Sequence, residues 1–164
     1  MGALDDTPLE IVVGRLLKQR GLTLALAESC TGGLVSHRVT NVPGSSAYYL
    51  GSVIAYSNEI KEWILQVRRD TLHRHGAVSE QAALEMAQGV RRTFHADVGL
   101  AVTGIAGPGG GTPEKPVGLI YISLAALDVE RVERHVWNGD RQENKNLSAE
   151  AVLDLLRRYL EDWS

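Results

Sequence analysis

The sequence predicts an α/β protein built as a three-layer α/β/α sandwich around a mostly parallel sheet. Apolar runs typical of strands alternate with segments of helical periodicity along most of the chain. Near the end, two strand-like runs are separated only by Asp128 and its neighbours, which indicates an antiparallel hairpin. With 164 residues, 44% of them hydrophobic, the chain is expected to form one domain, residues 1–164, whose core needs no disulfide or metal.

Helices are predicted where apolar residues recur every three or four positions. Pro8 and Gly21 bound the first helix, and Ser79 is the expected N-cap of a later one. The predicted helices cover residues 7–21, about 31–43, 58–67, 79–94 and about 140–163.

Strands are predicted where short apolar runs lie between turn residues. The predicted strands cover residues 22–27, 49–56, 97–104, 117–127 and 129–137. The stretch GIAGPGGGTPEKPVG lies between two of these runs, so it is predicted to be a long internal loop and not a domain linker.

Composition and charge limit the partners and the compartment. A formal charge of −3 and a pI near 5.9 give no general attraction for polyanions, so nucleic acid is not expected as a partner. No apolar run approaches the roughly 20 residues that a membrane span requires, so no membrane association is expected. The segment MGALDDTPLE lacks the features of a signal peptide, and the single cysteine cannot form an internal disulfide, so we expect a cytoplasmic protein.

Three segments with unusual chemistry follow three predicted strands. ESCTGG follows the first strand, YSNEIK the second and TGIAGPGGG the third. In open α/β sheets, ligands bind beyond the carboxyl ends of the strands, so these segments are expected to face one crevice.

The segment ESCTGG offers two candidate nucleophiles. Ser29 is one, because the amides and the dipole at a helix start would stabilise an oxyanion, and Thr31 with Gly32 and Gly33 would supply those amides. Cys30 is the rival, because a thiol in the same field would have a lowered pKa. Glu28 is expected to orient a neighbour or to bind a ribose hydroxyl.

These residues also have a purely structural interpretation. Ser29 and Thr31 could simply be helix N-caps, with the two glycines allowing a tight turn and close packing of helix on sheet.

The segment YSNEIK places a lysine where a helix dipole disfavours it. If Asn58 caps the helix, Lys61 occupies the third helical position, where a capping box would carry Glu or Gln. A partly buried Lys61 with a lowered pKa could take a proton from a serine hydroxyl, and Tyr56 could donate a hydrogen bond to the same site. The alternatives are a solvated surface lysine and a tyrosine that only packs at the sheet edge.

The glycine-rich loop offers exposed backbone amides and matches neither a Walker motif nor a dinucleotide fingerprint. Such nests suit a phosphate or a carboxylate, with Thr103 adding a hydroxyl and Lys115 a charge. Arg141, which opens the last helix, is an anion ligand or a surface charge. The glycines expected at the site are Gly104, Gly107, Gly109 and Gly110. The histidines are scattered, so no metal site is predicted.

Several long segments resemble the C-terminal domain family of the competence-damage-inducible protein CinA. The resemblance runs from about Leu24 to Leu156 and is carried by AESCTGGL, GSSAYYLGSVIAYSNEIK, GAVSE, AVTGIAGPGGG, EKPVGLIYI and GDR. It implies a mixed five-stranded sheet and hydrolysis of nicotinamide mononucleotide to nicotinic acid mononucleotide and ammonia, with no metal or organic cofactor. It also implies a homodimer.

The resemblance assigns roles to particular residues. It implies Ser29 as the nucleophile, supported by Tyr56 and Lys61. Three further side chains are implied in or near the site, namely Ser46, Thr103 and Arg141.

The chain departs from the family pattern at two positions. Lys145 stands where relatives commonly have an arginine, which puts an anion contact in doubt. Leu50 stands where relatives often have a charged residue, so an apolar side chain is expected at the rim of the pocket in place of a charge. Some members of the family are fused to a larger N-terminal domain, and the absence of one in this sequence favours a free-standing enzyme.

Two other functions remain open from the sequence. A regulatory module could bind a nucleotide or a protein without turnover, but such a module has no need of a neutral lysine beside Ser29. A cysteine amidase would use Cys30 and would be sensitive to thiol alkylation.

Overall fold

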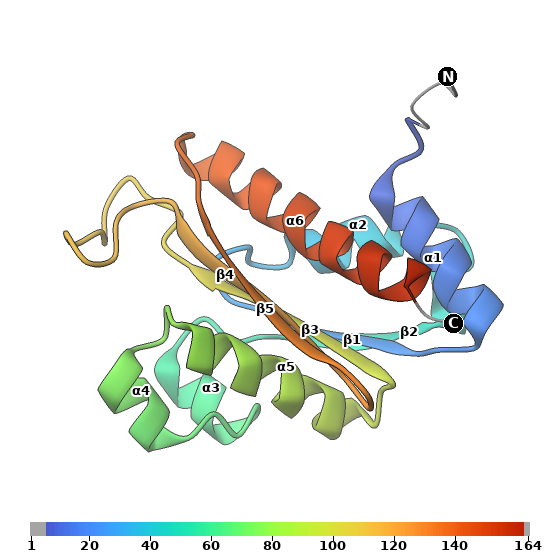
Figure 1. Cartoon of the computed structure of the whole chain (residues 1–164), viewed down its shortest axis with the longest axis horizontal. Coiled ribbons are helices and arrows are strands. Elements are labelled where there is room, and N and C mark those ends of the chain that lie inside the picture. Colours follow the sequence, from blue (N-terminus) through green and yellow to red (C-terminus); the bar gives the residue numbers. More distant parts are fainter. Residues whose placement is uncertain (1–5, 163–164) are drawn as a thin grey trace.

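A computed structural model describes residues 6–162 of the chain, which form a five-stranded sheet between two layers of helices (Figure 1). The sheet order is β2-β1-β3-β4-β5. β1 pairs in parallel with both β2 and β3, whereas β3–β4 and β4–β5 are antiparallel, so only β4 runs against the others. The strands are β1 (Leu24–Glu28), β2 (Tyr49–Ile54), β3 (Val98–Gly104), β4 (Leu119–Ala126) and β5 (Glu130–Val136). The predicted three-layer α/β/α sandwich with a mixed sheet is confirmed.

Helices cover both faces of the sheet (Figure 1). One layer contains α1 (Leu9–Arg20), α2 (Leu34–Thr40) and α6 (Arg141–Glu161). The other contains α3 (Asn58–Trp63), α4 (Arg69–His75) and α5 (Glu80–Phe94), and a short 3-10 turn, η1 (Ser45–Ala47), precedes β2. The predicted extension of the last helix to residue 163 and most of the N-terminal segment scanned for a signal peptide lie outside the described residues.

The central strands β1 and β3 are buried on both faces, and β1 is buried throughout because it lies between β2 and β3. On the α6 side, leucines such as Leu24 and Leu26 pack into one core cluster. On the α5 side, Ala25 and Ala27 belong to a second cluster. These small side chains let α5 lie close to the sheet, where a Cβ on Gly99 would come within 2.3 Å of the Ala87 carbonyl oxygen.

The helices α2, α3 and α4 differ from the prediction. α2 begins at Leu34 and not at Thr31, because the chain first makes a turn in which Gly32 and Gly33 have φ of 60° and 107°. α3 is capped by Ser57, whose hydroxyl accepts from the Ile60 amide, and not by Asn58. α4 was not predicted, since Leu72 is the one apolar residue among its seven and gives no apolar pattern.

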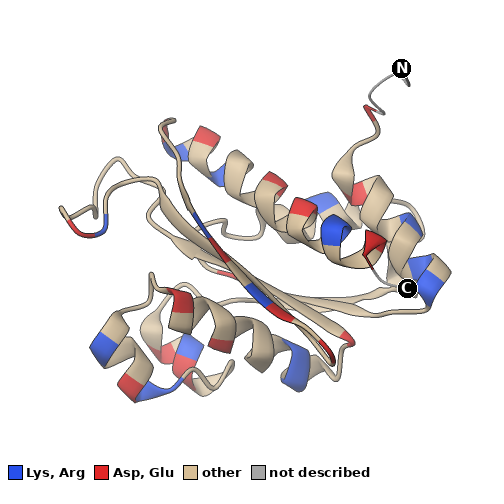
Figure 2. Cartoon of the chain, viewed as in Figure 1, with Lys and Arg blue, Asp and Glu red and all other residues tan. Residues whose placement is uncertain are grey.

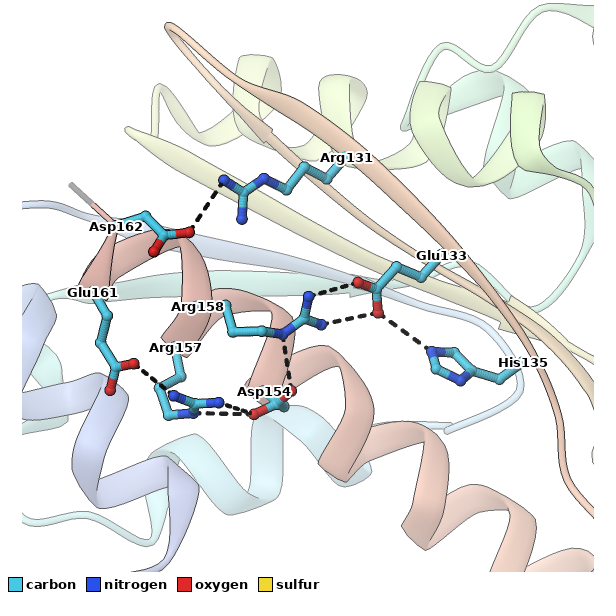
Figure 3. Close-up of polar contacts among 8 residues, drawn as sticks. All are labelled: Arg131, Glu133, His135, Asp154, Arg157, Arg158, Glu161 and Asp162. Carbon is cyan, nitrogen blue, oxygen red and sulfur yellow. Dashed lines mark hydrogen bonds and ion pairs between the residues drawn. The ribbon is translucent and has the colours of Figure 1, made fainter.

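The C-terminal half of α6 is tied to β5 by a network of ion pairs (Figure 3). Arg158 donates to both oxygens of Glu133, at 2.7 and 2.9 Å. Asp154 accepts from Arg157 and Arg158 on its own helix, so that both guanidinium groups are held in place. Forked pairs of this kind add geometric specificity, which here sets the position of α6 along the sheet.

Acidic and basic residues alternate along β5 and are interspersed over the helices in the view of Figure 2. Within residues 6–162, no helix has both the length and the apolar character needed to cross a membrane.

Candidate active site

A pocket of about 290 Å³ lies at the carboxyl ends of β1, β2 and β3. Its walls come from the three loops expected to meet there, from residues 77 and 78 before α5, and from Arg141 at the start of α6. A larger hollow, of about 680 Å³, lies at the other end of α5 beside Arg91, Arg92 and His95, but neither candidate nucleophile lines it. The predicted convergence of the three segments is therefore seen in the structure.

Ser29 and Lys61 meet at the bottom of this pocket. The Lys61 Nζ lies 3.0 Å from the Ser29 Oγ and donates to the Ala55 carbonyl oxygen at 2.6 Å. Sheet pairing brings them together, because the Ala55 amide donates to the Glu28 carbonyl and the Ser29 amide donates to the Val102 carbonyl. β1 therefore delivers the serine while β2 and α3 deliver the lysine.

Burial lowers the pKa of Lys61 to about 8, and negative charge on the nearby Cys30 would oppose this shift. The side chain is only 2% exposed, so its ammonium form lacks the hydration it would have in water. The expected cause was the dipole of α3 acting at the third helical position. Because Ser57 is the cap, Lys61 occupies the fourth position, and burial is the main cause. A neutral Lys61 can accept the proton of the Ser29 hydroxyl.

Cys30 lies beside Ser29 but lacks the environment of a reactive thiol. Burial raises its pKa to about 12, and the Glu28 carboxylate adds to this rise. A thiol with such a pKa is protonated at neutral pH, and the thiolate is the nucleophilic form. The burial of Cys30 and its raised pKa therefore argue against the cysteine mechanism.

Glu28 is buried and caps α2, so its carboxylate does not line the pocket. Its Oε1 accepts from the Thr31 hydroxyl and from the amides of Gly33 and Val35, and its Oε2 accepts from the Ser36 amide at 2.9 Å. Both oxygens are thereby occupied. Of the two roles expected for Glu28, orienting a neighbour fits these contacts and binding a ribose does not.

Two of the three amides expected to bind an oxyanion are engaged within the turn after Ser29. The Gly32 amide donates to the Ser29 carbonyl, and the Gly33 amide donates to Glu28. Thr31 is buried, with its hydroxyl bound to Glu28. These three residues shape the turn that presents Ser29, and none of them lines the pocket.

The glycine-rich loop forms one wall of the pocket as expected, through Gly104, Gly107, Gly109 and Gly110. Thr103 lies at the same wall, but its hydroxyl donates to the Ala77 carbonyl at 2.9 Å. Thr103 therefore ties the end of β3 to the segment before α5.

Arg141 and Tyr56 meet at the mouth of the pocket. The Arg141 guanidinium donates to the Tyr56 hydroxyl at 3.1 Å and to the Gly107 carbonyl at 2.7 Å. Tyr56 is 64% exposed, and its hydroxyl is bound to Arg141 instead of to Ser29 or Lys61. The two residues are thus placed to contact the outer part of a bound molecule.

Ser46 does not reach this pocket. It lies in η1, before the first residue of β2, whereas the pocket lies past the end of that strand. Leu50, the second residue of β2, is likewise outside the pocket lining.

Two lysines lie near the site without lining the pocket. The Lys115 ammonium donates to the His75 carbonyl, so its expected contribution to the glycine loop is not observed. The Lys145 Nζ lies beside the turn, 3.7 Å from where a Cβ on Gly32 would be.

Sequence reasoning missed two asparagines at the site. Asn58 lines the pocket, although it was expected only as a cap. Asn144 is buried, and it joins α6 to the glycine loop through a bond to the Ala106 carbonyl. One signal was available, because Asn144 falls on the same helical face as Ser148 and the apolar residues that follow. Within residues 6–162, no three His, Cys, Asp or Glu side chains are grouped to hold a metal ion.

The fold and the site define an α/β/α sandwich domain with a buried serine–lysine pair in a glycine-walled pocket. A family model for the CinA C-terminal domain matches residues 6–160. The chain therefore belongs to the CinA C-terminal domain family.

Relatives and solved structures agree with this assignment. A protein of Halothermothrix orenii, named as competence-damage inducible, is 54% identical over 95% of this chain, and a CinA-like protein of Thermotoga maritima is 49% identical over 96%. The chain spans only 38% of the length of each. The competence damage-inducible protein A of Klebsiella pneumoniae superposes with a TM-score of 0.91 at 34% identity, covering 95% of this chain and 97% of that one.

The lowered pKa of Lys61 predicts a pH-dependent stability. Between about pH 8 and roughly 10.4, the ordinary lysine value, the unfolded chain binds a proton that the folded protein has released. The free energy of unfolding should therefore rise through this window, by at most about 3 kcal/mol.

Denaturant unfolding across pH 7–11, compared with Lys61→Met, measures this contribution. The difference in unfolding free energy between the two proteins should change by that amount, while Lys18→Met, at an exposed position of α1, should follow the wild type. A Lys61→Met protein whose pH dependence matches the wild type would contradict the lowered pKa.

Proposed function

We propose that the protein is a nicotinamide-nucleotide amidase that converts nicotinamide mononucleotide to nicotinic acid mononucleotide and ammonia. The observation that carries the proposal is the buried Lys61 Nζ, 3.0 Å from the Ser29 Oγ, with its pKa lowered to about 8. Family membership and the glycine-walled pocket support the same conclusion.

The reaction follows from this pair. The Ser29 Oγ attacks the carboxamide carbon while its proton passes to neutral Lys61, and the carbonyl oxygen takes up the electron pair. When the tetrahedral intermediate collapses, the C–N bond breaks, and the Lys61 ammonium returns the proton to the departing nitrogen, which leaves as ammonia. Water then attacks the acyl ester with Lys61 again as the base, which releases the acid and regenerates Ser29.

Substrate charge favours both recognition and reactivity. The cationic pyridinium makes the neighbouring carboxamide carbon more electrophilic, and like-charge repulsion would further depress the pKa of Lys61. The 5′-phosphate would be held by amides of the glycine loop and by Arg141, which already lies at the pocket mouth.

A non-catalytic binding module is the second candidate function. Two facts favour it: one relative is named as competence-damage inducible, and the chain spans only 38% of the length of the two relatives described above. Against it stands the cost of burying an amine without a carboxylate partner, which a binding surface does not require.

The cytoplasmic location and the homodimer expected from the sequence stay predictions. Sedimentation equilibrium of the purified protein would test the homodimer.

The first functional prediction concerns the substrate. Ammonia release should be readily measured with nicotinamide mononucleotide and should fall by at least about 100-fold in kcat/KM with the riboside or free nicotinamide. The physical reason is that each charge-assisted contact to the phosphate contributes about 1.5–3 kcal/mol. Equal kcat/KM values for the nucleotide and the riboside would contradict the assignment.

A second prediction separates the two nucleophiles. Ser29→Ala should lose at least about 1000-fold in kcat, because the acyl intermediate cannot form. Cys30→Ala should keep most of the activity, since the protonated thiol of Cys30 only packs beside the serine. The matched pair removes one heavy atom at each of two adjacent residues, and the reverse pattern would establish a cysteine amidase.

A third prediction tests Lys61 as the base. Wild-type kcat/KM should rise with pH to a plateau, with an apparent pKa near the value of about 8 for Lys61 in the absence of substrate. Lys61→Arg, which stays charged, should lose at least about 100-fold in kcat at every pH with a folded structure by circular dichroism. An active arginine variant with an unchanged pH profile would show that Lys61 is not the base.

A further inference from the structure

Two successive carbonyl groups of the glycine loop are turned toward α6. The Asn144 Nδ2 donates to the Ala106 carbonyl oxygen at 3.0 Å, and the Arg141 guanidinium donates to the next carbonyl, that of Gly107, at 2.7 Å. The Asn144 Oδ1 in turn accepts from the Gly139 amide at 3.0 Å. Both ends of this buried amide are therefore engaged, and its direction is set.

The direction of the Ala106 carbonyl decides the direction of the next amide. In a planar trans peptide, the N–H of Gly107 points to the side opposite the carbonyl oxygen of Ala106. That oxygen is turned toward Asn144, so the Gly107 N–H is turned away from α6. Within residues 6–162 no group accepts a hydrogen bond from it, although Gly107 lines the pocket.

Gly107 holds a conformation that other residues rarely adopt. Its φ is +88°, and a Cβ there would lie 2.4 Å from a methyl carbon of Val117. The loop is thus shaped around a residue that offers only its backbone, and an unpaired N–H at a pocket wall is a ready donor to an anion.

We propose that the Gly107 amide donates to a phosphate oxygen of the substrate and that Asn144 is the positioning residue that aims it. This inference rests on the proposed function for the identity of the substrate, but the anion contact can be measured without turnover.

The test compares Asn144→Asp with Asn146→Asp. The first variant keeps the acceptor for the Gly139 amide, and its ionised form sets a carboxylate oxygen against the Ala106 carbonyl, which disfavours the native direction of the peptide. The second adds the same charge two residues further along α6 at an exposed position and controls for electrostatics. Asn144→Ser, which removes the contact without adding charge, serves if the aspartate variant does not fold.

Two readouts are expected to change together. KM for nicotinamide mononucleotide should rise by about 10-fold or more in Asn144→Asp, with kcat within about threefold of the wild type, as for the loss of one bond to a charged group. The dissociation constant for inorganic phosphate, followed by the amide shift of Gly107 in ¹⁵N spectra, should rise by a similar factor. Asn146→Asp should match the wild type in both.

Several outcomes would overturn the proposal. A lower melting temperature with unchanged KM and phosphate affinity would make Asn144 a purely structural tie. A fall in kcat at constant KM would assign the amide to the developing oxyanion and not to the phosphate. A Gly107 amide that does not respond to phosphate in the wild type would refute the contact, whereas a response without amidase activity would reject only the proposed function.

Discussion

The candidate site depends on one buried carboxylate at the end of the central strand. Glu28 takes hydrogen bonds from the turn and the first turn of α2, so the chain can reverse direction directly after β1. Amides at a helix start and a carboxylate attract each other, which offsets the cost of burying the charge. Because Glu28 is followed at once by Ser29, the same interaction that caps the helix aims the candidate nucleophile.

A second strand brings a buried amine to the candidate nucleophile. The parallel pairing of β1 and β2 aligns Glu28 with Ile54, and α3 then returns over the strand ends with Lys61 directed inward. Burying the amine costs stability, since the charged form loses hydration. The same cost lowers its pKa and makes the neutral form available near neutral pH, which the proposed reaction requires.

The outer part of the pocket is assembled from the far end of the chain. α6 carries Arg141 and Asn144, which hold two neighbouring carbonyls of the glycine loop. Its other end is fixed to β5 by the Arg158–Glu133 pair (Figure 3). α6 therefore contacts the glycine loop at its start and β5 near its end.

The sequence by itself determined the layers and the strand positions, because apolar periodicity is a local signal. It also determined which three segments meet at the site, because ligands in open α/β sheets bind beyond the carboxyl ends of the strands. It also singled out Ser29 and Lys61. Only the tertiary structure decided what the neighbouring groups do. Glu28 faces α2, the Gly32 and Gly33 amides are engaged within the turn, and Ser46 lies at the opposite end of β2. Hydrogen-bond partners far apart in the chain set those directions, and no pattern of residue types along the sequence encodes which of two partners a buried polar group will take.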